Sequence, residues 1–449
     1  MRNTKPPQID LNSPEVARKA IALSGRADVR TFVDQMNVAY HSWSDVRYRP
    51  RPEGLNVEDA WLVVKWSRRS FSDLPIQDVK GRPFRFWLPP SAQRALHMLD
   101  RQAGDLLSFE GVEKRGLELT KTRVLIDSHM EEAIATSQIE GAVTTRREAK
   151  NLLRAGRTPR DRSEQMIVNG YRTIQLLSER AKKPMSVELL HQIQASMTEG
   201  TLDNADHSGR FRRPSDPQVD VVDTRDNEVV FTPPPPELID ARMQRLIDFA
   251  NEPPDVEPFI HPLVRASVLH FWLAYEHPYN DGNGRTARSL FYWYMLKSGY
   301  WLFEFLTISR VIHAGKMKYY RAFVFAETDD CDLTYFILYK LRATGKAIEQ
   351  LREQIRNIAI QEQRVRSVLG DGGFNARQRA LIDHAIRHPT QVYTFESHRN
   401  SNGITLLTAR QDLIELVEKK LLHEVGKKRP REFSAAPTLL RRAKRASAD

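Results

Sequence analysis

Residues 277–288 read His-Pro-Tyr-Asn-Asp-Gly-Asn-Gly-Arg-Thr-Ala-Arg, and they join two apolar stretches with helical spacing, 263–276 and 285–298. The first backbone N–H groups of a helix have no partner within it, and the helix dipole favours an anion there. Gly282 and Gly284 lack a Cβ, so the backbone can approach a phosphate closely. The stretch therefore predicts a phosphate-binding loop at the start of the second helix.

Four side chains of this loop suit the chemistry of phosphate transfer. Arg285 and Arg288 are three apart on one helix face and can bind further phosphate oxygens. Asp281 offers a hard oxygen ligand for a Mg²⁺ that also binds substrate phosphates. His277 can accept a proton at neutral pH. Asp-Gly and Asn-Gly are also common turn signals, so the residues alone leave an ordinary turn as the alternative.

The twelve residues resemble the signature of the Fic family, HPFxDGNGRxxR in one-letter code. The single departure is Tyr279, which stands at the family's Phe position and must place a hydroxyl in the core. The resemblance covers roughly residues 110–345. It implies a mostly α-helical Fic fold with a β-hairpin flap.

The resemblance also implies an activity, the transfer of AMP from ATP to a Ser, Thr or Tyr hydroxyl of a target protein or of the chain itself. His277 would be the base that deprotonates the hydroxyl, and Asp281 would hold Mg²⁺ between the α- and β-phosphates. Such a reaction needs positioning and charge neutralisation more than covalent chemistry from the protein. The implied nucleotide-binding residues are Gly282, Asn283 and Gly284 as the anion hole, Arg285 at the β-phosphate, Arg288, and Tyr320.

Tyr320 belongs to this set through the pair Tyr319-Tyr320, which resembles a family pair beside the nucleotide. Its ring could stack on the adenine, and core packing is the alternative reading.

A second motif lies upstream, in the run Thr136-Ser137-Gln138-Ile139-Glu140-Gly141. Thr136 and Glu140 are four apart on one face, near the end of a helical pattern that Gly141 terminates. Alone, this pattern indicates an exposed helix end. It resembles the inhibitory motif [S/T]xxxE[G/N] of Fic proteins, which implies that Glu140 pairs with Arg288 and keeps the γ-phosphate from its productive position. The inhibitory helix would span about residues 120–141.

Residues 219–231 predict a β-hairpin, because valines stand on both sides of the turn-like residues 224–227, and the prolines 233–236 end the pairing. The hairpin resembles the Fic flap, which aligns a target segment by strand addition. The preceding run 209–212, Gly-Arg-Phe-Arg, is similar to the family's flanking pattern. An ordinary surface hairpin is the alternative.

Composition bounds the class of protein. The chain has 449 residues, 68 Lys+Arg against 57 Asp+Glu, and a formal net charge of +11. Its one cysteine, Cys331, excludes an internal disulfide and a multi-cysteine zinc site. The most apolar stretch, 290–306, is interrupted by Lys297, Gly299 and Glu304, so it predicts buried core and not a membrane span. With no secretory signal at the first residues, we expect a cytoplasmic protein without a membrane partner.

The C-terminal residues 375–433 predict three helices and a hairpin. Residues 404–413 resemble the third helix of winged helix-turn-helix domains, and 421–433 would form the wing. Arg410 and the wing tip could contact DNA, while protein contacts or homodimer packing are the alternative. Residues 426–445 are strongly basic, with Lys427, Lys428, Arg429, Arg431, Arg441, Arg442, Lys444 and Arg445 against a single acid, Glu432.

These patterns divide the chain into an N-terminal helical region (1–109), a Fic domain (110–345), a helical linker (346–373), and a winged helix domain with a basic tail (374–449). Two alternatives to AMP transfer stay open within enzymes: removal of AMP, and transfer of another nucleotide's phosphate group. A third changes class, a DNA-binding regulator whose Fic core senses nucleotide.

Overall fold

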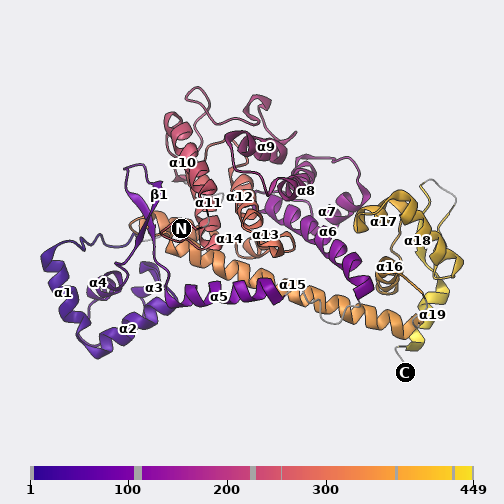
Figure 1. The fold of residues 1–449 in the computed structure, drawn as a ribbon, viewed down its shortest axis with the longest axis horizontal. Helices are drawn as coiled ribbons and strands as arrows, with labels where there is room; N and C mark the ends of the chain where they lie inside the picture. The colour runs from indigo at the N-terminus through magenta and orange to yellow at the C-terminus, as the bar shows by residue number, and fades with distance from the viewer. Residues whose placement is uncertain are drawn as a thin grey trace.

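The protein is described by a computed structural model over residues 5–105, 114–222, 229–253, 255–369, 373–426 and 430–446. It is mostly helical, as predicted. Figure 1 shows three groups of elements in a row: the N-terminal helices at one end, the helices around the signature loop in the middle, and the C-terminal elements at the other end. One helix of 36 residues, α15 (Thr334–Leu369), leads from the middle group to the C-terminal group.

The N-terminal group has a small apolar core of its own, built around Phe32, Trp61 and Val64. Its elements are α1 (Pro14–Ser24), α2 (Ala27–Val38), α3 (Trp43–Val46) and α4 (Val57–Ser67), followed by β1 (Ser72–Gln77), β2 (Pro83–Phe86) and α5 (Pro90–Asp105).

The antiparallel pair β1–β2 corrects the expectation that this region contains only helical stretches. Leu74 and Ile76 on β1, and Phe84 and Phe86 on β2, are buried and alternate with neighbours that are less buried, and all four join the main core of the protein. This alternation has a period of two residues, which is typical of β-strands, and it is present in the sequence.

The middle group is centred on two antiparallel helices whose residues are almost all buried, α11 (Pro262–Glu276) and α12 (Asn283–Lys297). The stretch 290–306 lies in the core, with Leu290, Phe291 and Trp293 fully covered. The helices of this group are α6 (Lys114–Ile139), α7 (Arg146–Ala155), α8 (Arg162–Arg180), α9 (Val187–Thr198), α10 (Ile239–Asn251), α11 (Pro262–Glu276), α12 (Asn283–Lys297), α13 (Ile308–Ala314) and α14 (Lys316–Thr328). Across the described residues, no helix is both long and apolar enough to cross a membrane.

Helix α6 crosses the middle group and is held closely against α8. A Cβ on Gly170 of α8 would lie 3.4 Å from Ala133 of α6, which is tight packing between two helix backbones. Gly141, just beyond the helix, has φ of 97°, a left-handed conformation that ends α6 as predicted. Thr145 and Glu148 then form the capping box of α7.

The C-terminal group has a separate apolar core that includes Ile382, Leu413 and Phe433. The expected order of three helices and a hairpin is present, and a further helix, α19, follows it. The winged helix assignment itself stays a prediction. The elements are α16 (Ala376–Arg387), α17 (Phe395–Asn402), α18 (Leu406–Glu418), β5 (Leu422–Glu424), β6 (Phe433–Ala435) and α19 (Pro437–Ala446).

Two expected boundaries and one expected contact surface can be compared with these elements. The boundary between 345 and 346 falls inside α15, so no element ends there. The boundary at 109–110 and the wing tip of Lys427, Lys428 and Arg429 lie outside the described residues.

Candidate functional site

The signature loop connects α11 to α12 in a closely determined conformation. His277 is the residue that ends α11, with φ of 50° and ψ of 54° in the left-handed region. Gly282 (φ 86°) precedes α12, which begins at Asn283, two residues before the expected stretch 285–298. The Asn283 side chain accepts a hydrogen bond from the Tyr279 N–H (2.9 Å) and donates one to the Tyr279 carbonyl (2.7 Å). These two bonds close the loop on itself.

Tyr279 accommodates the hydroxyl that distinguishes it from phenylalanine. Its side chain is fully buried, and its hydroxyl lies 3.2 Å from Nδ1 of His191 on α9. Its ring packs against His191 and Phe211. The substitution therefore leaves the loop anchored, with the extra polar atom paired.

His277 is arranged as a proton acceptor. Its Nδ1 lies 3.2 Å from the Ala274 carbonyl. Because a carbonyl only accepts, Nδ1 carries the proton and Nε2 presents its lone pair. Burial lowers the pKa of His277 below its ordinary value, and that favours the neutral imidazole.

Asp281 stands at the outer side of the loop with a side chain that is 43% exposed. Nη2 of Arg285 lies 3.3 and 3.4 Å from its two carboxylate oxygens, and Nη2 of Arg162 lies 3.7 Å away. Arg285 also donates to the Met197 carbonyl (2.8 Å), which fixes its guanidinium beside the loop. Two cations thus share one accessible carboxylate.

Arg288 contacts the end of α6. It donates from Nη2 to Glu140 Oε1 (2.7 Å) and from Nε to Thr136 Oγ1 (2.7 Å), and Nη2 also reaches the Thr136 carbonyl at 3.1 Å. Arg288 is 3% exposed, whereas the Glu140 side chain is 33% exposed. Burial opposes ionisation, but Arg288 and Arg285 hold the pKa of Glu140 below its usual value, so its carboxylate is charged at neutral pH.

The Glu140 carboxylate also lies against the first turn of α12. A Cβ on Gly284 would be 2.4 Å from Glu140 Oε1, so a side chain at this position would displace the carboxylate. The first N–H groups of α12 belong to Asn283, Gly284 and Arg285 and have no acceptor within the helix. An anion of the protein therefore already stands at the predicted phosphate-binding turn.

Tyr320 and Tyr319 differ in surroundings. Tyr319 is buried, and its hydroxyl lies 2.9 Å from Nε2 of His270. Tyr320 is 43% exposed, with its ring centroid 5.5 Å from that of Tyr319. The stacking of Tyr320 on adenine stays a prediction.

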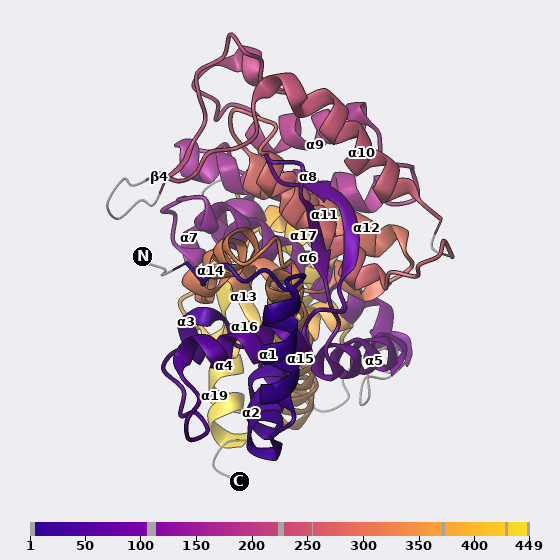
Figure 2. The same cartoon turned by 90° about the vertical axis from the view of Figure 1, so that its left-hand side faces the viewer.

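The expected hairpin is present as β3 (Val221–Val222) paired antiparallel with β4 (Val229–Phe231). Val222, Val229 and Val230 are exposed by 44%, 56% and 49%. In Figure 2, β4 lies at the periphery of the molecule. The predicted turn 224–227 lies outside the described residues.

Sequence reasoning missed Gln194, a fully buried residue of α9 that supports the loop. It donates from Nε2 to the Asp281 carbonyl (3.1 Å) and accepts from the Gly209 N–H at Oε1 (2.7 Å). One side chain thereby joins the signature loop to the segment before the flap. Nothing in the local pattern of α9 distinguishes this glutamine from an exposed one.

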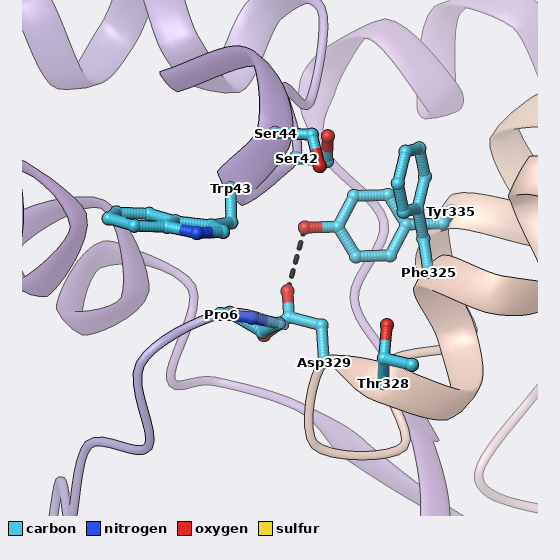
Figure 3. Close-up of a pocket in the computed structure, with 8 residues that line it drawn as sticks. All are labelled: Pro6, Ser42, Trp43, Ser44, Phe325, Thr328, Asp329 and Tyr335. Atoms are coloured by element: carbon cyan, nitrogen blue, oxygen red, sulfur yellow. Dashed lines mark hydrogen bonds between the residues drawn. The ribbon is translucent and has the colours of Figure 1, made fainter. Parts of the chain in front are cut away.

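A small pocket elsewhere is not a ligand site. Its lining includes the Asp329 carboxylate, which accepts from the Tyr335 hydroxyl at 2.8 Å (Figure 3). Its free volume is about 10 Å³, room for at most one water. Its lining residues are Pro6, Ser42, Trp43, Ser44, Phe325, Thr328, Asp329 and Tyr335, none of them in the signature loop.

Known proteins resemble this chain around the same loop. Residues 184–295 match the sequence model of the Fic/DOC family. The protein adenylyltransferase fic-1 of Caenorhabditis elegans is 39% identical over 70 residues, which is 16% of this chain and 13% of the relative. The protein adenylyltransferase Fic of Nematostella vectensis is 36% identical over 69 residues, 15% of this chain and 16% of the relative. The matches thus span less than a fifth of either relative's length.

Solved structures also resemble the chain. The structure of Fic-1 from C. elegans gives a TM-score of 0.49 at 18% identity and covers 76% of this chain and 85% of that one. A Fic family protein from Desulfovibrio desulfuricans gives 0.47 at 19% identity and covers 76% of this chain and 96% of that one.

Proposed function

We propose that the chain is a protein adenylyltransferase, which moves AMP from ATP to a hydroxyl side chain of a target protein or of itself, because residues 184–295 match the Fic/DOC family model. The observation that carries the proposal is the loop between α11 and α12. There a neutral His277 and the carboxylate of Asp281 flank the first turn of α12, whose N–H groups have no acceptor within the helix.

The residues of the loop divide the reaction between them. His277 Nε2 accepts the proton of the target hydroxyl as its oxygen bonds to the α-phosphorus of ATP. The bond from that phosphorus to the oxygen it shares with the β-phosphate breaks, and pyrophosphate leaves. The N–H groups at the start of α12 and the guanidinium of Arg285 neutralise the developing charge.

Asp281 would hold a Mg²⁺ ion. Its carboxylate is accessible and sits beside the proposed phosphate site, which suits an ion bound by one or two carboxylates and by substrate phosphates. In the described ranges, no group of three or more His, Cys, Asp or Glu side chains is placed to form an all-protein metal cage. When bound, the ion would neutralise charge on the α- and β-phosphates.

We propose further that Glu140 inhibits the transfer. It engages Arg288, which nucleotide phosphates would otherwise bind, and it fills space at the first turn of α12. Two anions cannot share that turn without strong repulsion. Replacing Glu140 by glycine removes the competing carboxylate and leaves Arg288 with Thr136 as its remaining partner.

The proposal is tested by incubating the purified protein, alone and with cell lysate, with α-³²P-ATP and Mg²⁺. We expect weak labelling by the wild type, strong labelling by Glu140→Gly, and none by Glu140→Gly/His277→Ala. Absence of label from every variant would overturn AMP transfer, and label that persists without His277 would overturn its role. Loss of label from pre-labelled protein on adding wild type would instead indicate AMP removal.

A second proposal concerns DNA binding by the C-terminal group. Arg410 is exposed on α18, and Arg441, Arg442 and Lys444 are exposed on α19. We expect a salt-dependent shift of duplex DNA that Arg410→Ala weakens and that Arg94→Ala, at an exposed arginine of α5, does not. Equal binding by both variants would exclude readout through α18.

A further inference from the structure

Arg212 lies three residues after Gly209 and is a buried cation surrounded by backbone carbonyls. It is 7% exposed. Its Nε donates to the His277 carbonyl at 2.8 Å, and its Nη2 reaches the carbonyls of Glu276 (3.4 Å) and Pro234. Its own N–H donates to the Pro278 carbonyl at 2.8 Å.

These carbonyls need such a donor. The last carbonyls of a helix have no intrahelical N–H, and a cation near the C-terminus of α11 satisfies them and opposes the negative end of the dipole. His277 also has a left-handed backbone, which is unfavourable for a residue with a side chain unless its surroundings maintain it. The guanidinium of Arg212 donates to the last carbonyls of α11 and also supports the left-handed backbone of His277, the proposed base.

The same guanidinium reaches the far side of the flap. Pro234 follows β4 by three residues, so its carbonyl lies where the chain leaves the flap and returns to the middle group. A planar fork with several N–H groups can bond to both carbonyls at once, whereas the single ammonium of lysine cannot reproduce that geometry.

We propose that Arg212 is a positioning residue, which fixes the backbone of His277 relative to the base of the flap so that a hydroxyl on a segment paired with the flap meets Nε2. The inference rests on the proposed function. Its consequence is that Arg212 governs the rate of transfer and not the binding of ATP, because its bonds go to the base and the flap.

The chain offers a matched control two residues away. Arg210 belongs to the same segment, and its guanidinium bonds to the Asp216 carboxylate at 2.6 and 3.0 Å instead of to the signature loop. Arg210→Lys and Arg212→Lys are thus the same change in one segment, and only the second removes the fork beside His277.

The test uses the full chain in the Glu140→Gly background, with self-labelling by α-³²P-ATP as the rate and calorimetric titration of ATP with Mg²⁺ as the measure of binding. We expect Arg212→Lys to lower the maximal rate about 10- to 100-fold with ATP affinity within about twofold, because small misplacement of a reacting group costs that much. Arg210→Lys should keep the rate. A Glu140→Gly parent that does not label would contradict the proposed function and leave no transfer for Arg212 to govern.

A second variant, Arg212→Gln, removes the charge. Its effect on the pH dependence of the rate distinguishes a role beside His277 from a purely structural role. Besides burial, the charge of Arg212 lowers the pKa of His277, whereas Asp281 and, in the wild type, Glu140 raise it. Without that charge the base needs a higher pH to be neutral, so the acid limb of the rate profile should move to higher pH, while Arg212→Lys leaves it in place. Unchanged rate in Arg212→Lys, an unmoved limb in Arg212→Gln, or loss of ATP binding in both would each overturn the inference.

Discussion

The C-terminal tip of helix α6, residues 136–140, and the middle of the helix are held in different ways. At its C-terminal end, the contacts to the signature helix converge on one residue, Arg288, which binds Thr136 and Glu140. Glu140 itself stands just past the last helical residue, Ile139, and its side chain is one-third exposed (33%). The contact is strong in charge but small in extent.

The middle of α6, residues 126–131, contacts more of its surroundings, and we call this part the seat. Lys150 of α7 lies 2.5 Å from Glu131 and 2.7 Å from Asp127, and Arg146 also pairs with Glu131. Helix α17 of the C-terminal group packs on the same part, where a Cβ on Gly403 would come within 2.9 Å of the Ile126 side chain.

This difference indicates that the proposed inhibition can be released without moving the helix. Removing the carboxylate from Arg288 requires a change only in the last residues of α6, next to Gly141. Displacing the whole helix would break the ion pairs with α7 and the contacts with the C-terminal group. We therefore expect changes at the tip to alter activity and changes at the seat to alter stability.

The largest effect is expected from Glu140→Gly, which should raise AMP transfer about 10- to 100-fold, because a charge-assisted hydrogen bond is worth about 1.5–3 kcal/mol. Glu140→Gln keeps an acceptor without the charge and should lie between. Rates of self-labelling with α-³²P-ATP measure both. A glutamine variant as active as the glycine variant would show that charge alone maintains the inhibition.

The next largest effect is expected at the middle of α6, and it is an effect on stability. Lys150→Ala removes both ion pairs and leaves Glu131, a buried acid, with Arg146 alone, so the free energy of unfolding should fall by about 1–3 kcal/mol. Urea unfolding measures the change. Arg172→Ala, which breaks an exposed pair with Glu199, should cost at most about 1 kcal/mol. Increased labelling by Lys150→Ala would contradict the expectation that changes in the middle of α6 alter stability and not activity.

A smaller effect is expected from Thr136→Ala. The change removes the hydroxyl acceptor of Arg288 Nε but keeps the carbonyl contact and Glu140, so labelling should rise only about threefold. Thr136→Ser retains the hydroxyl and should behave as the wild type. A rise as large as that of Glu140→Gly would mean that the hydroxyl, and not the carboxylate, limits release.

The smallest effect on activity is expected from Asn400→Ala. Asn400 of α17 donates to the Arg154 carbonyl at the end of α7 (2.6 Å), far from the tip of α6 in sequence. Labelling should change less than about twofold, while amide exchange in α17 quickens. Strong activation by this variant would show that the C-terminal group controls Glu140 through α7, which would contradict the separation.

Much of the site was predictable because it is built from near neighbours in the chain. The start of α12, two residues from its expected position, and the end of α6 at Gly141 each depend on contacts within a few residues. The hairpin β3–β4 follows from valines around a short turn. The pair β1–β2 was overlooked because its alternating residues are few and stand among helices.

Other parts needed the folded chain, because nothing local specifies which distant groups meet. The hydroxyl of Tyr279 finds His191, and Gln194 reaches the Asp281 carbonyl, across 88 and 87 positions. The sequence does not distinguish Arg212 from a surface arginine. Only the folded chain shows that the last carbonyls of α11 lie beside it.

The sequence by itself therefore determined the chemistry of the loop: a histidine, a carboxylate, two arginines, and glycines that open the start of a helix to an anion. Only the tertiary structure decided what that loop faces. It joined Arg288 to Glu140 across 148 positions and His277 to Arg212 across 65. The physical reason is that spacing along the chain sets local conformation, whereas the packing of helices selects which buried charges and carbonyls must satisfy one another.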